Sequence, residues 1–217
     1  MKKGVLVCAA VLALAAFAPR PMEAAVTFDL GLKGGVSISN ARWSDDDGSE
    51  KSLVKPTFGV FATINVTPTI AIQPEVNYLT VGELWSDTLD DTAYKDVLFQ
   101  NYLHIPVLLK ARLSQQGQIV PVIFAGPAVN VLLSAHDKTY VDGVLDDDEN
   151  VKEWFKSTEF GVDFGVAAEM MMSSIKLIID LRYYLGLTNP YIEPEFYSVK
   201  NNAVMITIGA GFDLSAR

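Results

Sequence analysis

The stretch IKLIIDLRYYLGL, residues 175–187, decides the fold of this chain. Apolar side chains occupy its odd positions, whereas the charged residues Lys176, Asp180 and Arg182 all fall at even positions. Successive side chains of a β-strand point to opposite faces, so this alternation predicts a strand with one apolar and one charged face. An amphipathic helix would instead repeat its apolar positions every three or four residues.

The same period of two recurs from residue 26 to the end of the chain. It predicts eight strands, over residues 26–38, 54–66, 70–80, 103–113, 119–133, 158–170, 175–187 and 204–214. No charged residue falls on the apolar stripe of any of these segments. Residues 119–133 are apolar on both faces, which leaves their phase open, and Pro121 and Pro127 weigh against a membrane helix there.

The connections between the segments alternate in length. Short turns fall at residues 67–69, 114–118 and 172–174, and long polar segments at 43–52, 84–97, 135–157 and 189–202. This alternation puts all the long connections at one end of an up-and-down antiparallel sheet. The long connections also hold the acidic excess behind the net charge of −9, because the strands and short turns balance acid and base. The acidity argues against a nucleic-acid partner.

Residues 1–24 have the form of a cleaved secretory signal. A basic start precedes an apolar run at residues 5–18, which is shorter than a membrane helix needs. The alternative is a retained anchor helix. We expect a single domain over residues 25–217, because no linker or change in composition divides the strands. The only cysteine, Cys8, falls in the apolar run, so the exported chain would carry no thiol.

Alternation alone leaves open whether the apolar faces line a cavity or face lipid. Soluble barrels carry charges outside, whereas the polar faces here mix glycines with charges of both signs, as a tight interior would. Aromatic residues lie in the long connections or near strand ends, as interfacial girdles require: Trp43, Trp85, Trp154, Tyr78, Tyr94, Phe99, Tyr102, Tyr183, Tyr191 and Tyr197. A closed barrel also satisfies every backbone donor within lipid. We therefore predict an all-β, eight-stranded antiparallel up-and-down transmembrane β-barrel in a bacterial outer membrane, with four long acidic outer loops and short periplasmic turns.

Charged residues on the polar faces predict a network inside the barrel. Its members are Asp29, Lys33, Glu75, Lys110, Arg112, Asp163, Glu169, Asp180 and Arg182. A proton relay or a charged constriction is one interpretation. We favour a mutually neutralising plug, because side chains fill an eight-stranded barrel and an unpaired buried charge costs several kcal/mol. A wide pore is disfavoured, and no residue pattern indicates a cofactor.

Several short motifs, taken in order, carry a resemblance. They are GLKGGV at 31–36, YLHIPVLLK at 102–110, AGP at 125–127, DFGV at 163–166 and DLRYYLGL at 180–187. Together they resemble the PorT-like outer-membrane β-barrel family of Bacteroidetes-type bacteria. The resemblance spans residues 26–214 and implies an eight-stranded outer-membrane barrel with no assigned enzymatic activity. The family's namesake is an accessory of a protein secretion system.

The last predicted strand carries a second likeness. Thr207, Gly209, Phe212 and Leu214 are similar to the signal read by the barrel assembly machinery: a polar residue, a glycine, then two apolar residues two apart. This likeness implies that machinery as a partner, beside outer-membrane lipid and lipopolysaccharide. The alternative is that any final barrel strand contains glycine and alternating apolar residues.

Other patterns leave alternatives open. Ser134 and His136 lie near acidic residues, as in lipid A-modifying barrels, but in the reverse of the His-x-Ser order of the deacylase type, and His104 is expected to point inward. The acidic runs at 45–48 and 146–150 could attract divalent ions loosely, without forming a calcium loop. The triplets at 87–89 and 91–93 resemble an O-glycosylation signal of Bacteroidetes.

These patterns favour a non-enzymatic integral outer-membrane protein whose surface loops carry its role in envelope integrity, adhesion or partner binding. One alternative is an accessory of a secretion system, which depends on the family resemblance and would add a secretion-system partner. The other alternative is a lipid A-modifying enzyme.

Overall fold

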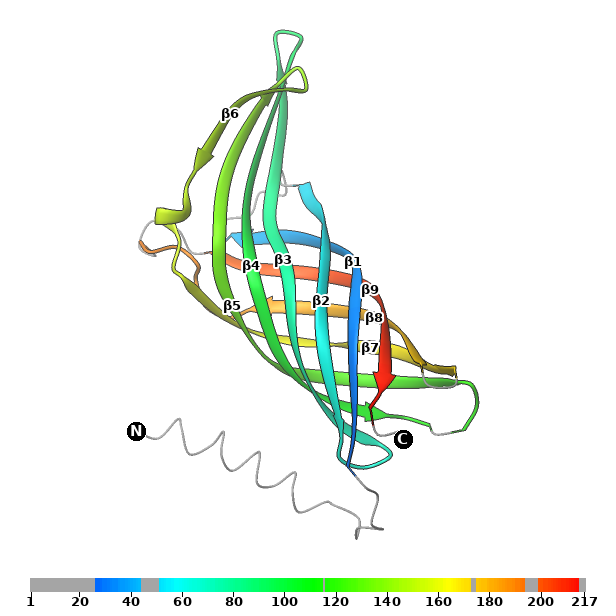
Figure 1. The fold of residues 1–217 in the computed structure, drawn as a ribbon. Coiled ribbons are helices and arrows are strands. Elements are labelled where there is room, and N and C mark those ends of the chain that lie inside the picture. The colour runs from blue at the N-terminus through cyan, green and yellow to red at the C-terminus, as the bar shows by residue number, and fades with distance from the viewer. Residues whose placement is uncertain (1–25, 44–50, 115, 173–174, 194–198, 215–217) are drawn as a thin grey trace, which may run out of the picture.

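The computed structural model describes residues 26–43, 51–114, 116–172, 175–193 and 199–214. It contains nine strands and one short helix in these residues: β1 Thr27–Trp43, β2 Lys51–Asn65, β3 Ile70–Leu89, β4 Thr92–Arg112, β5 Ile119–Val141, β6 Val144–Asn150, η1 Lys152–Trp154, β7 Thr158–Met172, β8 Ile175–Gly186 and β9 Val199–Asp213. All strands except β6 form a closed antiparallel ring, because β1 pairs with β9 and β4 pairs with β5 (Figure 1). The predicted all-β antiparallel barrel is confirmed. The predicted signal at residues 1–24 lies outside the described residues.

The two faces of the ring differ as the alternation predicts. Apolar residues on the outer face are exposed, among them Leu32, Val60, Phe160, Ile179 and Ile208. Their chain neighbours on the inner face are buried or half-buried. A continuous apolar outer band therefore surrounds the barrel, as contact with lipid requires. No helix in the described part of the chain is long and apolar enough to cross a membrane.

The structure defines which side chains of residues 119–133 face the barrel interior. Val122, Phe124 and Ala128 are buried inside the ring, whereas Ile119 and Ile123 are exposed outside. The barrel interior thus receives apolar side chains from β5, next to charged residues from its neighbours.

Two of the four predicted long loops are wrong, because they are paired strands. β3 and β4 continue to a tight turn at Asp90 and Asp91, which have φ of 48° and 61°. β5 continues to Val141 and turns back into β6, a ninth strand that the sequence pattern did not predict. These hairpins project beyond the ring (Figure 1). Their hydrogen-bond ladders continue where the apolar stripe stops, so the stripe marked the lipid-facing part of each strand and not its end.

The ladder between β2 and β3 is irregular between Ser52 and Phe58. Two hydroxyl groups of β1 bridge this break, since Ser37 and Ser39 donate to the carbonyl oxygens of Thr80 and Gly82, each at 3.1 Å. Ser39 Oγ also accepts from the Gly82 N–H at 3.1 Å, so side-chain hydroxyls replace part of the missing backbone ladder.

Glycines on β1 and β9 make room for one ring inside the barrel. A Cβ atom added at Gly31 would lie 2.2 Å from the Phe61 ring and 2.5 Å from the Ala210 carbonyl oxygen. At Gly209 and Gly211 it would lie 3.5 Å from the same ring. The polar-face glycines therefore create the space that the buried Phe61 fills.

Candidate functional site: a filled interior and an exposed hairpin end

Ion pairs fill the part of the interior nearest the short turns. Lys110 Nζ donates to Glu169 Oε1 at 2.5 Å, and Arg112 Nε donates to Glu169 Oε2 at 2.8 Å. Lys176 on β8 pairs with Asp29 on β1, across the intervening strand β9. Each of these carboxylates therefore has a cation within hydrogen-bond distance.

A second group of charges surrounds Arg182 near the middle of the barrel. Its guanidinium binds Glu75 with two parallel hydrogen bonds of 2.9 and 3.0 Å. The same group donates to Asp163 at 3.0 Å and to Asp180 at 2.8 Å. Lys33 Nζ donates to Glu75 Oε2 at 2.6 Å. This fork geometry is the one that arginine forms with carboxylates and lysine cannot form.

Uncharged polar residues connect the charged groups. Gln73 accepts from Lys110 at 3.0 Å and donates to Glu75 at 2.7 Å, which joins the two layers. His104 lies 2.6 Å from Asn130 Oδ1 and 3.0 Å from Asp163 Oδ2. A prediction based on charged residues alone misses these uncharged members of the network. Gln73 and His104 could have been found by position, because each points to the same inner face as the charged residues on its strand.

The structure brings all nine predicted network residues together in the interior. Lys176 joins them as a tenth member. The ten divide into five basic residues (Lys33, Lys110, Arg112, Lys176 and Arg182) and five acidic residues (Asp29, Glu75, Asp163, Glu169 and Asp180). The network is therefore balanced in charge, which is the condition for keeping ionised groups out of water.

The interior toward the hairpins changes from polar to apolar. Glu159 accepts from Tyr184 at 2.8 Å and from Asn201 at 2.9 Å, and this group borders an apolar cluster. The cluster contains Leu79, Val81, Leu98, Tyr102, Ala128, Leu132, Ala135, Val151, Phe155, Tyr184, Tyr191, Val199, Ala203 and Met205, with Trp85 packed against it. Tyr102 and Tyr191 are thus buried inside, which corrects their predicted place in an interfacial girdle. Tyr197 lies outside the described residues.

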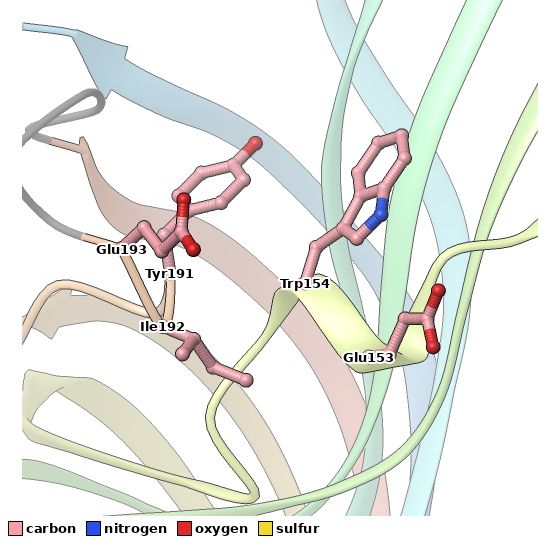
Figure 2. Close-up of a pocket in the computed structure, with 5 residues that line it drawn as sticks. All are labelled: Glu153, Trp154, Tyr191, Ile192 and Glu193. Atoms are coloured by element: carbon pink, nitrogen blue, oxygen red, sulfur yellow. The ribbon is translucent and has the colours of Figure 1, made fainter.

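An open cavity of about 500 Å³ lies above this cluster. Glu153 and Trp154 of η1 line one side, and Tyr191, Ile192 and Glu193 line the other (Figure 2). Backbone bonds hold the two sides together, because Ile192 donates to the Trp154 carbonyl at 2.9 Å. Among the described residues, the lining combines two aromatic rings with two carboxylates and contains no basic residue. Such a surface suits a group that is cationic or rich in hydroxyls.

The remaining candidate residues are placed as follows. The hydroxyl of Ser134 accepts from Asn101, whereas His136 lies 2.9 Å from Asp148, so each has a partner other than its neighbour. In the described chain, no three His, Cys, Asp or Glu residues form a group that could hold a metal ion. Residues 146–150 belong to the exposed strand β6, and the run at 45–48 lies outside the described residues. Both glycosylation-like triplets flank the β3–β4 turn.

The predicted assembly-signal residues lie at the end of β9. Thr207 is buried inside the barrel, and a Cβ atom at Gly209 would meet Lys33 at 3.0 Å. Phe212 and Leu214 are exposed on the outer face. Leu214 follows the last residue of β9 and still donates its backbone N–H to Phe28. Recognition by the assembly machinery stays a prediction.

Residues 20–191 match the family described as outer membrane protein beta-barrel domain. The chain belongs to this family. No curated protein matches it. Among solved structures, a major outer membrane protein from Thermus thermophilus is similar over 88% of this chain and 100% of its own, with 13% identity and a TM-score of 0.51.

Two further barrels show weaker likeness. Neisserial surface protein A matches 84% of this chain and 96% of its own, with 13% identity and a TM-score of 0.44. The outer membrane protease OmpT from Escherichia coli matches 89% of this chain and 99% of its own, with 10% identity and a TM-score of 0.36. The family match places this barrel in the outer membrane, and the comparisons assign it no activity.

Proposed function

We propose that this outer-membrane barrel is a filled, non-enzymatic anchor that presents its hairpin end to a partner at the cell surface. The filled interior carries the proposal. Ion pairs, an apolar cluster and the Phe61 ring fill it, and the cavity of about 500 Å³ at the hairpin end offers open surface on the side that faces away from the cell. The hairpins face outward and the short turns face the periplasm, as in other bacterial barrels.

The cavity above the apolar cluster offers a surface for a partner. Trp154 is 43% exposed although two backbone-bridged segments hold its position. An exposed tryptophan on a held backbone offers contact area at low entropic cost, which is typical of binding anchors. The carboxylates Glu153 and Glu193 favour a partner that brings a basic group to the cavity.

The side-chain pairing at the rim supports a non-enzymatic role. A hydrolytic barrel of the lipid A-modifying type needs a serine or water activated by a histidine within hydrogen-bond reach. Ser134 and His136 are each bonded to other residues. If the chain nevertheless modifies lipid A, a deletion strain will show an altered lipid A mass that a His136→Ala chain fails to restore.

Photo-crosslinking in cells tests the presenting role. A photoreactive residue in place of Trp154 should yield a discrete protein adduct, and the same residue in place of the lipid-facing Leu113 should yield none. A secretion-system component in that adduct would select the accessory role and support PorT-like membership, which stays a prediction. Crosslinks that are equal at the two positions would contradict the proposal.

A further inference from the structure

Cationic side chains gather around one phenyl ring on the hairpins. Lys55 Nζ lies 5.0 Å from the centre of the Phe99 ring, and Lys138 Nζ lies 6.0 Å from it. The His136 ring stacks on Phe99 with a centre-to-centre distance of 5.6 Å. Three groups that can carry positive charge, one from β2 and two from β5, thus converge on one aromatic surface.

Phe99, His136 and Lys138 lie on the outer face of their strands, just beyond the apolar band, and Lys55 reaches Phe99 from the side of β2 that also carries the buried Leu53 and Thr57. Phe99 shares its parity along β4 with Leu103 and with the exposed Val107 and Leu109. The row of Asn101 and Ser134 separates Leu103 from the row of Phe99 and His136. Four residues of a strand tilted by about 45° rise about 9 Å along the membrane normal. The headgroup layer is about 5–8 Å deep on each side of the hydrocarbon core, so the cluster lies at the outer edge of this layer.

Further lysines extend this cluster sideways. Lys95 Nζ lies 5.5 Å from the Tyr140 ring, Lys51 bonds Ser86, and Lys152 donates to the carbonyl of Leu133. We call Lys51, Lys55, Lys95, Lys138 and Lys152 the lysine collar. Among the described residues, Lys55 and Lys95 contact aromatic rings and form no ion pair. Their charge is therefore available to a ligand.

Acidic residues are distributed differently over the same hairpins. Asp148 receives hydrogen bonds from Lys138 of the collar at 2.7 Å and from His136 at 2.9 Å. Asp90, Asp91 and Asp142 lie at the hairpin turns, farther from the apolar band. Asp96 and Asp137 lie level with the collar, but each is the chain neighbour of a collar lysine and so points to the opposite face of the sheet. An anion on the lysine face would therefore meet the lysines before the acids of the turns.

We infer that the lysine collar binds the phosphate groups of anionic lipid in the outer leaflet, with Phe99 and His136 as the surface against which the headgroup rests. Lysine near a charged membrane surface attracts anionic lipid, and lysines at several positions act together. This inference depends on insertion in the outer membrane, but it does not depend on a partner at the Trp154 cavity.

Native mass spectrometry of the full chain released from detergent tests the inference. Bisphosphorylated lipid A should be retained about 10- to 30-fold more than dephosphorylated lipid A with the same acyl chains. The Lys55→Gln/Lys138→Gln variant should lose most of this preference. Lys200→Gln, which changes an exposed lysine on β9, should keep it.

Three results would overturn the inference: equal retention of the two lipids, an equal loss in Lys200→Gln, or displacement of the lipid by inorganic phosphate at millimolar concentration. The last result would identify a site for free phosphate. Should the double variant fail to fold, as judged by its heat-dependent gel shift, the comparison of the two lipids on the unaltered chain decides alone. Crosslinking at Trp154 reports separately on the proposed function.

Discussion

Arg182 is the residue on which the interior network depends most. Its guanidinium contacts Glu75, Asp163 and Asp180, and it lies 5.1 Å above the Phe124 ring. No other cation among the described residues contacts more than two of these carboxylates. Removing it would leave buried negative charge without compensation, which costs more than the network contributes when complete.

Arg182→Met should therefore lower the free energy of unfolding by about 3–5 kcal/mol. Urea titration in lipid vesicles measures this change. The free energy of unfolding of Arg182→Lys should lie between those of the unaltered chain and Arg182→Met, since lysine keeps the charge but cannot form the fork with Glu75. Lys95→Met on the surface is the control, expected to change stability by less than about 0.5 kcal/mol. Equal stability of Arg182→Met and the control would contradict a neutralising role.

The glycines around Phe61 allow a matched pair of substitutions. Gly31→Ala should destabilise the barrel by about 1–3 kcal/mol, because the added methyl group overlaps the Phe61 ring and the Ala210 backbone. Gly34→Ala should be neutral or slightly stabilising, since its nearest contact would be an ordinary 3.8 Å. The same urea titration applies to both. If Gly34→Ala lowered the free energy of unfolding more than Gly31→Ala, the conclusion that Gly31 makes room for Phe61 would be wrong.

At the scale of elements, the apolar stripes predicted the ring and failed at the hairpins. Within the ring, the outer face contacts lipid and needs apolar residues, whereas the inner face holds the packed charges. The sequence of each strand therefore alternates between the two residue types. Outside the membrane, residues 84–97 pair as strands although both of their faces meet water or other segments of the same chain. Cross-strand partners such as Thr139 with Asp96 and Lys95 with Tyr140 stabilise these hairpins, and one chain's alternation does not reveal such pairs.

Asp137 makes the β5–β6 hairpin sensitive to pH. Burial raises the pKa of its carboxyl group, and the nearby carboxylates of Asp96, Glu149 and Asp147 raise it further. A pKa raised in the folded hairpin means that the protonated form is favoured there. Protonation of Asp137 therefore stabilises the folded hairpin. This stabilisation is complete at pH values below the ordinary pKa of 3.8 and is lost as pH rises through the raised pKa.

Asp137→Asn should therefore slow amide hydrogen exchange in β6 at neutral pH, by about two- to fivefold after solvent screening. The difference from the unaltered chain should shrink as pH falls through the raised pKa. Asp146→Asn changes the net charge equally on the exposed strand β6 and should have a smaller effect. Equal slowing in both variants would assign the effect to net charge and not to the site of Asp137.

At the scale of the whole molecule, charge is sorted by height. The ten-residue ion-pair network is balanced, whereas the buried Glu83 and Glu159 lie outside it, the lysine collar is basic, and the hairpin turns are acidic. The sequence predicted the balance inside and the acid outside, because both follow from counting along segments. It did not predict the collar, because Lys55, Lys95 and Lys138 come from three strands and meet only when β2, β4 and β5 lie together.

The central claim is that the barrel is a filled anchor and not a conduit. Ion conductance through planar bilayers containing the refolded full-length barrel tests this most directly. The filled interior predicts a current equal to that of the protein-free bilayer, without discrete steps. Stable, stepwise ohmic conductance in proportion to the amount of inserted protein would contradict it.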